Sequence, residues 1–193
     1  MKILIILGHP SKTSLNGALA DSYQEEAETK GHEVRRINLG DLDFDPILHD
    51  GYNTIQELEP DLVAAQESMV WAEHIVLFSP MWWGAPSALL KGFIDRTILP
   101  GFGYKYHKND PFWDKLLTGR SGHIIHTTDS PWIWAKFVIK NSDVHMLKRE
   151  FLQFCGINPV KVTSINNLRG SSKEQIKNHI KNIKKTVPKL SAR

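Results

Sequence analysis

The stretch that most constrains the fold runs from Ile75 to Lys91 and reads IVLFSPMWWGAPSALLK. Its first residues, Ile75–Phe78, are all apolar, as expected of a strand buried on both faces of a parallel sheet. Ser79-Pro80 is expected to end that strand, and Pro86 suits the first turn of a following helix. Packing alone does not explain two adjacent tryptophans between a strand and a helix. Because ligands bind at the carboxyl ends of strands in open α/β sheets, this stretch predicts an aromatic loop that holds a flat ligand.

The rest of the chain alternates between short strands and segments with helical spacing. The expected strands are Ile3–Leu7, Glu33–Ile37, Ile75–Phe78, Gly122–His126 and Pro159–Ile165. The expected helices are Ser14–Lys30, Pro60–Ala72, Pro86–Ile98, a region that reaches Phe154 with a break near Asn141, and Lys173–Val187. The segment Pro100–Lys115 is expected to stay irregular. Strands joined by helices lie parallel, so the alternation predicts an α/β fold: a three-layer, doubly wound, flavodoxin-like sheet of five parallel strands in the order 2-1-3-4-5. No linker or repeat interrupts it, which predicts one domain over residues 1–193.

Composition argues against several classes of function. The formal net charge is +3 over 193 residues, which is too small an excess to indicate nucleic-acid binding. The single cysteine, Cys155, cannot form an intramolecular disulfide, and its apolar neighbours predict a packed, inert thiol. The apolar run Ile3–Leu7 is too short for a signal peptide, and no stretch is long enough to span a membrane. We therefore expect a cytoplasmic protein with no transmembrane segment.

The loop after the first strand, GHPSKTSLNG, is rich in groups that bind anions. Thr13, Ser14 and Asn16 stand at the start of a helix, whose free amides and positive dipole end favour a phosphate. Lys12 adds a positive charge, and His9 lies in the same loop. A single hydroxyl there would be explained by ordinary helix capping, but the whole set favours a phosphate site. The loop has neither the Gly-Lys-Ser/Thr ending of a P-loop nor the G-x-G-x-x-G of a Rossmann site.

Two further loops leave neighbouring strands at the same edge of the predicted sheet. Pro80–Gly84 offers aromatic rings and backbone amides to a planar heterocycle, although contact with a second subunit would explain its composition equally. Thr127–Ser130 is small and polar, which suits hydrogen bonds to the edge of such a ring or a simple turn. His123 and His126 are three apart on a strand and so face opposite sides of the sheet. We therefore expect no metal site.

Taken together, these residues resemble the flavodoxin-like NAD(P)H dehydrogenases (quinone), a group that includes quinone reductases, modulators of drug activity and potassium-efflux ancillary proteins. The resemblance covers roughly residues 1 to 165. It rests mainly on the central block EPDLVAAQESMVWAEHIVLFSPMWWGAPSALLKGFIDR at 59–96, with GHPSKTSLNGAL at 8–19 and PGFGYKY at 100–106 in support. HTTDS at 126–130 and FLQFCGI at 151–157 are weaker matches.

The resemblance implies a bound flavin and a ping-pong reaction, in which NAD(P)H gives a hydride that passes to a quinone or similar acceptor. The helix-terminal loop favours FMN, with FAD as the alternative, and the family suggests a homodimer with its active site at the interface. The residues assigned to the flavin by the resemblance are His9, Thr13, Ser14, Leu15, Asn16, Pro80, Met81, Trp82, Trp83, Gly84, Thr127 and Thr128. Tyr104 and Tyr106 would belong to the loop that covers the substrate pocket, and His126 is the candidate proton donor.

The chain departs from the family after the threonine pair, where Asp129-Ser130 replace the two glycines of larger members. A Tyr and a His that shuttle protons in the larger animal quinone reductases also have no clear counterpart between Pro131 and Asn141. A second class of function therefore stays open: a flavin-binding regulatory or ancillary subunit of a partner such as a potassium-efflux system, with little turnover. A flavodoxin-type electron carrier is less favoured, because such carriers are usually strongly acidic and this chain is mildly basic.

Overall fold

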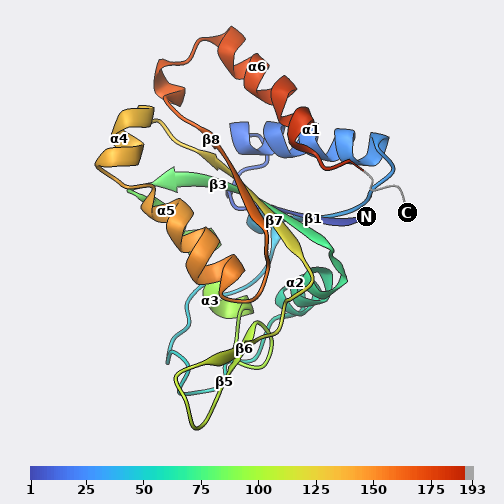
Figure 1. Ribbon diagram of the computed structural model, residues 1–193, viewed down its shortest axis with the longest axis vertical. Helices are drawn as coiled ribbons and strands as arrows, with labels where there is room; N and C mark the ends of the chain where they lie inside the picture. The colour runs from blue at the N-terminus through green and yellow to red at the C-terminus, as the bar shows by residue number, and fades with distance from the viewer. Residues whose placement is uncertain (190–193) are drawn as a thin grey trace.

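The apolar runs form a five-stranded parallel sheet in the computed structural model, which describes residues 1–189 (Figure 1). The strands are β1 (Lys2–Leu7), β2 (Glu33–Asn38), β3 (His74–Trp82), β7 (Ser121–Thr127) and β8 (Val160–Ile165). Their order is β2-β1-β3-β7-β8, and every neighbouring pair is parallel. The predicted flavodoxin-like sheet of order 2-1-3-4-5 is therefore confirmed.

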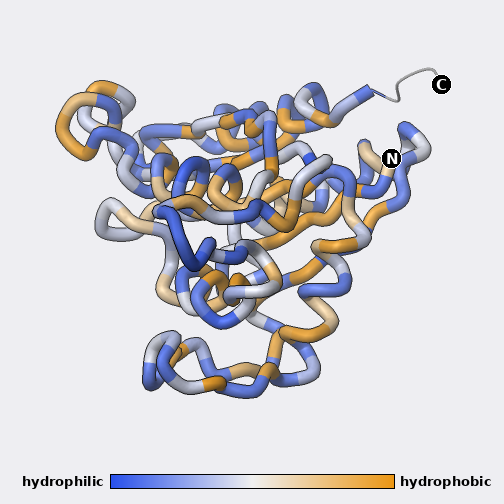
Figure 2. Tube along the Cα trace, turned by 60° about the horizontal axis from the view of Figure 1, so that its bottom comes forward, coloured by the Kyte–Doolittle hydropathy of each residue, from blue (hydrophilic) through white to orange (hydrophobic). Residues whose placement is uncertain are grey.

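Helices cover both faces of this sheet and make three layers (Figure 1). The helices on one face are α1 (Leu15–Thr29) and α6 (Lys173–Ile183), and those on the other are α2 (Pro60–Trp71), α3 (Ala88–Thr97) and the π-helix η2 (Met146–Gln153). Short 3-10 turns follow β2, β8 and α6 as η1 (Leu39–Asp41), η3 (Leu168–Gly170) and η4 (Lys184–Thr186). The central strands β1 and β3 are covered on both sides and are apolar in both directions over most of their length, whereas the edge strands β2 and β8 carry exposed polar side chains. In Figure 2 largely orange segments accordingly run through the middle of the molecule.

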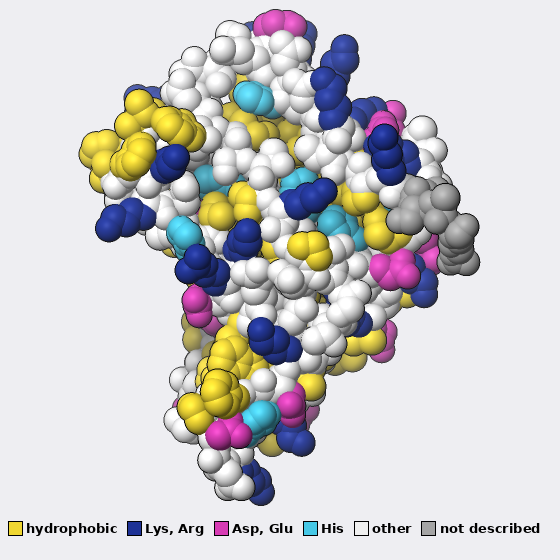
Figure 3. Space-filling model, viewed as in Figure 1, with side chains coloured by type: hydrophobic (Ala, Val, Ile, Leu, Met, Phe, Trp, Pro, Cys, Tyr) yellow, Lys and Arg dark blue, Asp and Glu magenta, His cyan; other side chains and the backbone are white. Residues whose placement is uncertain are grey.

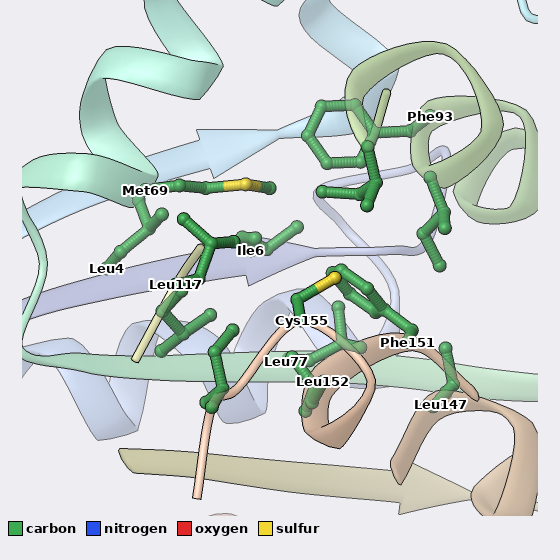
Figure 4. Close-up of a cluster of buried hydrophobic side chains, with 14 of the residues drawn as sticks. Leu4, Ile6, Met69, Leu77, Phe93, Leu117, Leu147, Phe151, Leu152 and Cys155 are labelled. Atoms are coloured by element: carbon green, nitrogen blue, oxygen red, sulfur yellow. The ribbon is translucent and has the colours of Figure 1, made fainter. Parts of the chain in front are cut away.

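The larger of the two cores lies between the sheet and the layer of α2, α3 and η2 (Figure 4). Leu4 and Ile6 of β1 point into it, while Ile3 and Ile5 point into the core under α1 and α6. Cys155 is fully buried in the larger core, and burial raises the pKa of its thiol to about 12. The thiol stays protonated at neutral pH, which confirms the prediction of a packed, inert cysteine.

Strand β3 does not end at Ser79-Pro80 as expected, but continues to Trp82. The carbonyl of Phe78 accepts a hydrogen bond from the amide of Gly8 at 2.8 Å, at the end of β1. Alternate residues of a strand direct their backbone groups to the same neighbour, so the backbone nitrogen of Pro80 also faces the β1 side. At that level β1 has already ended. A proline there breaks no ladder hydrogen bond. Beyond Phe78, β3 pairs only with β7, and its last residues turn back in an antiparallel hairpin with β4 (Ala85–Pro86).

Of two further segments, one differs from expectation and the other agrees with it. Part of the stretch expected to be irregular forms an antiparallel ribbon, in which β5 (Tyr104–Tyr106) pairs with β6 (Trp113–Lys115) and Tyr106 lies opposite Trp113. The helical region after β7 is divided into α4 (Trp132–Phe137) and α5 (Ser142–His145), which continues into η2. The break expected near Asn141 is confirmed, because Lys140 and Asn141 both have left-handed backbone angles.

The acidic segment between η1 and α2 is irregular but firmly attached. The Arg96 side chain is fully buried on α3 and donates to the carbonyls of Asp45 and Glu57 and to the Glu59 carboxylate. A buried guanidinium that satisfies several acceptors in this way fixes the loop against the helix. Within the described residues, no helix has the length and apolar character needed to cross a membrane.

Candidate active site

The carboxyl ends of β1, β3 and β7 open onto one cleft, which we call the donor cleft. Its volume is about 190 Å³, and its lining comprises His9, Ser14, Leu15, Asn16, Pro80, Met81, Trp82, Thr127, Thr128, Asp129 and Leu168. Nine of the twelve residues expected at a cofactor site therefore meet in one place. The other three, Thr13, Trp83 and Gly84, lie outside this lining.

The loop after β1 forms one end of the donor cleft. Ser14 caps α1 by accepting the amide of Gly17, and its hydroxyl also donates to the carbonyl of Ser11 at 2.7 Å. The hydroxyls of Ser11 and Thr13 lie 2.9 Å apart, so Thr13 supports the loop instead of lining the cleft. In the described chain, the backbone amides of Leu15 and Asn16 donate to no protein acceptor. Two free amides at a helix N-terminus make this end of the cleft suited to an anion.

Lys12 does not add its charge to the cleft as expected. Its ammonium group lies 3.1 Å from the Asp41 carboxylate, and this contact lowers the pKa of Asp41. The positive character of the loop therefore comes from backbone amides and the helix end and not from a free lysine.

The threonine pair at the end of β7 forms another wall of the cleft, in contact with the start of α1. The side-chain nitrogen Nδ2 of Asn16 donates to the Thr127 hydroxyl at 2.8 Å, and this bond connects the first loop to β7. Thr128 donates its backbone amide to Ile165, and the carbonyl of Thr128 accepts the amide of Leu168. The Asn16 side-chain oxygen is buried and has no partner among residues 1–189. An unpaired acceptor beside two unpaired amides indicates that a polar ligand completes this wall.

The β3–β4 hairpin forms the aromatic wall. Trp82 is about half exposed, and its ring meets the His9 ring edge to face with centroids 5.4 Å apart. Trp83 and Gly84 are the two turn residues, both with positive φ, at 55° and 75°. These are the signs of a type I′ turn, which favours Asn or Gly and not tryptophan at its first position. Trp83 is nevertheless fully exposed, with 104% of its reference surface accessible.

Two larger hollows adjoin the donor cleft. The first, the upper groove, has a volume of about 530 Å³ and shares Met81, Thr128 and Asp129 with the donor cleft before passing under Trp83 and Gly84. The second, the apolar groove, has a volume of about 640 Å³ on the other side of the hairpin. Its lining is Trp82, Trp83, Gly84, Ala85, Pro86, Ala88, Lys91, Ser142, Asp143 and Met146. The hairpin thus stands between a polar cleft and an apolar groove, and all three hollows meet around it.

The three residues expected to act in catalysis do not line the donor cleft. His126 is fully buried, with its Nε2 2.9 Å from Oδ2 of the buried Asp143 on α5. Tyr104 and Tyr106 line a separate pocket of about 270 Å³ near Tyr52 and Phe154. Tyr104 is buried, and burial raises its pKa to about 12, so at neutral pH it is a hydrogen-bond donor and not a base. Residues 1–189 contain no group of three side chains that could hold a metal ion.

Sequence reasoning placed the Thr127–Ser130 loop, which contains Asp129, at this edge, but it did not single out Leu168 or Asp143 as lining residues. Leu168 follows the end of β8, whose carboxyl end reaches the same edge as the other loops, so the strand order was a usable signal. For Asp143 no sequence signal exists, because its approach to His126 depends on how α5 packs against β7.

Comparisons with known proteins agree with this fold. A family model described as flavodoxin-like fold matches residues 1–187. The ribosyldihydronicotinamide dehydrogenase-like protein traD of Penicillium crustosum is 30% identical over 66% of this chain, which spans 57% of that protein's length. NAD(P)H dehydrogenase [quinone] 1 of Rattus norvegicus is 25% identical over 91% of this chain and 73% of its own.

Solved structures show the same fold. Smu.1420 from Streptococcus mutans UA159 is 30% identical and superposes with a TM-score of 0.82 over 96% of this chain and 98% of that one. The NAD(P)H:quinone oxidoreductase from Methanothermobacter marburgensis superposes with a TM-score of 0.81 over 96% of both chains. At 17% identity, this similarity shows only that the two proteins share a fold. The chain belongs to the flavodoxin-like family, and its curated relatives include proteins named NAD(P)H dehydrogenase [quinone] and NAD(P)H oxidoreductase.

Proposed function

We propose that this protein is a flavin-dependent NAD(P)H:quinone oxidoreductase that uses FMN. The observation that carries the proposal is the donor cleft, where unpaired amides at a helix end, an aromatic hairpin and a threonine pair surround one space. FMN has a phosphate at one end and a planar ring with a hydrogen-bonding edge at the other. The buried free cysteine is compatible with the reducing environment of the cytoplasm.

Each wall of the cleft has a role toward such a ligand. The amides of Leu15 and Asn16, with the hydroxyl of Ser14, would hold the phosphate at the positive end of α1. Met81 and Trp82 would lie along the ring, and the upper groove gives that ring room beyond the small donor cleft. Thr128 would bond its polar edge. The bound flavin supplies hydride transfer, from NAD(P)H in one half-reaction and to the acceptor in the other.

The chain itself positions the two substrates. The apolar groove beside Trp82 and Trp83 offers an acceptor such as a quinone a surface that excludes water, with few polar groups to compete. Only one planar substrate at a time is expected to pack against the hairpin. NAD(P)H would therefore leave before the acceptor enters, which is the ping-pong order.

A homodimer would explain the apolar surface around the site. Exposed fractions between 54% and 64% are found for Trp132, Ile133, Trp134 and Phe137 of α4 and for Val138 directly after it. They form the hydrophobic cluster that projects at the upper left of Figure 3, in the same region of the molecule as the upper groove that Ile139 lines. Contiguous apolar surface of this kind marks interaction sites. A second copy seated here would enclose the grooves, so that the active site lies at the interface.

Reconstitution tests the proposal. Flavin-free protein is mixed with FMN or FAD, excess ligand is removed, and the absorbance spectrum and the oligomeric state are measured. We expect bound FMN, a dimer, and steady oxidation of NADH or NADPH with menadione. Retention of FAD alone would change the cofactor. Bound flavin with turnover near background would favour the regulatory class, and failure to bind either flavin would refute the enzyme assignment.

A further inference from the structure

The tip of the β5–β6 ribbon is closed by polar contacts and not by packing. The ribbon stands away from the sheet at the lower end of Figure 1, and its base is held where the Trp113 ring stacks on Phe154 with centroids 4.4 Å apart. Residues 107–112, which join the two strands, are all exposed. The ladder has three residue pairs, and a two-stranded ribbon of this size is marginally stable in water. Its tip therefore depends on contacts between its own residues.

His107 lies at the centre of these contacts. Its Nδ1 lies 2.9 Å and 3.0 Å from the two carboxylate oxygens of Asp110, and its Nε2 lies 3.1 Å from Oδ1 of Asp114. The backbone amide of His107 donates to the Phe112 carbonyl at 3.1 Å, and the Phe112 amide donates to Oδ1 of Asp110 at 2.8 Å. One imidazole ring thus connects the end of β5 to both the turn and β6.

These contacts fix the protonation state of the ring. An ionised carboxylate only accepts hydrogen bonds, so each ring nitrogen must carry a proton to bond with its neighbour. The ring that spans Asp110 and Asp114 is therefore an imidazolium ion. In agreement, the hydrogen bonds to Asp114 and Asp110 raise the pKa of His107 above its usual value. A neutral imidazole has one N–H and can hold only one of the two carboxylates.

Few other charges lie around the ring. Among residues 1–189, Asp114 and Asp110 are the charged side chains with the largest effect on the pKa of His107. Lys105 is the register partner of Asp114, and Lys108 follows His107 in the chain, but neither forms an ion pair with these carboxylates in the described structure. The protonation of one imidazole therefore decides whether both carboxylates are held.

We propose that His107 forms, with Asp110 and Asp114, a pH-sensitive clasp that closes the tip of the ribbon while the imidazole is doubly protonated. When the ring loses one proton to water, one carboxylate is released and the tip loosens. The clasp is closed below pH 6.5, where even an unpaired histidine is protonated, and it opens as the pH rises through the raised pKa of His107. Because β5 carries Tyr104 and Tyr106, the clasp couples pH to one wall of the pocket of about 270 Å³ that they line. It involves no residue of the donor cleft and no bound flavin.

Histidine titration and amide exchange, both followed by NMR on the full chain, test the clasp. The ring signal of His107 is identified by its disappearance in His107→Gln, and in the wild type we expect its titration midpoint above pH 6.5. Asp114→Asn should lower that midpoint, because it removes one of the two negative charges that contact the ring. The Phe112 amide reports whether the tip is closed. Its protection, corrected for the intrinsic exchange rate, should fall by up to about tenfold per pH unit between pH 6.5 and the His107 midpoint, and level off above it.

His107→Gln should remove this pH dependence of the Phe112 amide. The matched control is His49→Gln, because His49 is also exposed and lies 2.7 Å from an aspartate, Asp45, in a different loop. It should leave protection of the tip unchanged. The amides of β3 serve as the reference and should be equally protected in every variant at each pH. A His107 midpoint at or below pH 6.5, tip protection that stays constant over this range, or a wild-type pH dependence in Asp114→Asn would each overturn the assignment.

Discussion

The most informative single substitution is Trp83→Asn in the β3–β4 hairpin, because it should make the flavin-free protein more stable. Trp83 has a φ of 55° and is fully exposed, so the wild-type side chain carries backbone strain without any burial to offset it. A left-handed conformation costs an ordinary residue about 1–2 kcal/mol, and asparagine followed by glycine is a preferred pair in a type I′ turn. Since no buried contact is lost, we expect a gain of about 1 kcal/mol, which for a chain of this size raises Tm by about 2–4 °C.

The same change should weaken ligand binding. Removing one aromatic wall of the two grooves loses a stacking contact of about 0.5–1.5 kcal/mol, so flavin or acceptor affinity should fall severalfold. The assay is urea unfolding of flavin-free protein at low concentration, followed by fluorescence titration with FMN. Trp82→Asn is the control, because Trp82 packs on His9 and has no left-handed backbone, so it should lose stability. A loss of stability in Trp83→Asn would refute the argument from strain.

Three further outcomes test other parts of the structure. Gly17→Ala would place its Cβ 1.8 Å from the Lys12 carbonyl oxygen, about 1.2 Å closer than the 3.0 Å that such contacts require. The loop after β1 would therefore have to move, and we expect FMN affinity, measured by titration, to fall at least tenfold. Phe137→Glu on exposed α4 should convert a dimer to a monomer in sedimentation without lowering the unfolding midpoint of the monomer. Burial lowers the pKa of both His74 and His123 to about 4, so these histidines take up protons more readily in the unfolded chain. The free energy of unfolding, measured with urea, should be at its full value above pH 6.5. It should fall between pH 6.5 and pH 4 by about 1.4 kcal/mol per pH unit for each histidine. The decline should be shallower in His123→Gln, and a slope that does not change would contradict the burial argument.

The sheet and most of the donor cleft were predictable because they follow from local patterns. A strand covered by helices on both faces must be apolar throughout, and loops that follow neighbouring parallel strands must meet at one edge. That is why His9, Asn16, Met81 and Thr128, from three separate loops, were assigned together and are found together.

What the sequence could not show depends on tertiary contacts. The extension of β3 past Pro80 is possible only because β1 ends first, and nothing local to Pro80 indicates this. Tyr104 and Tyr106 were expected to cover the substrate pocket in a dimer-related site; within one subunit they line a pocket of their own, so that expectation stays a prediction. The approach of Asp143 to His126 requires the left-handed turn between α4 and α5, which the sequence marks only as a break.

Backbone strain gathers around the same edge. The non-glycine residues with positive φ in the described chain are Trp83, Lys140, Asn141 and Asn167. Trp83 is the hairpin tip, Lys140 and Asn141 immediately precede the serine that holds that hairpin, and Asn167 precedes Leu168 in the cleft lining. Such conformations cost about 1–3 kcal/mol each and persist only where surrounding structure enforces them. Their position beside the unpaired amides of the donor cleft is the arrangement expected where a fold holds strained residues around a binding site.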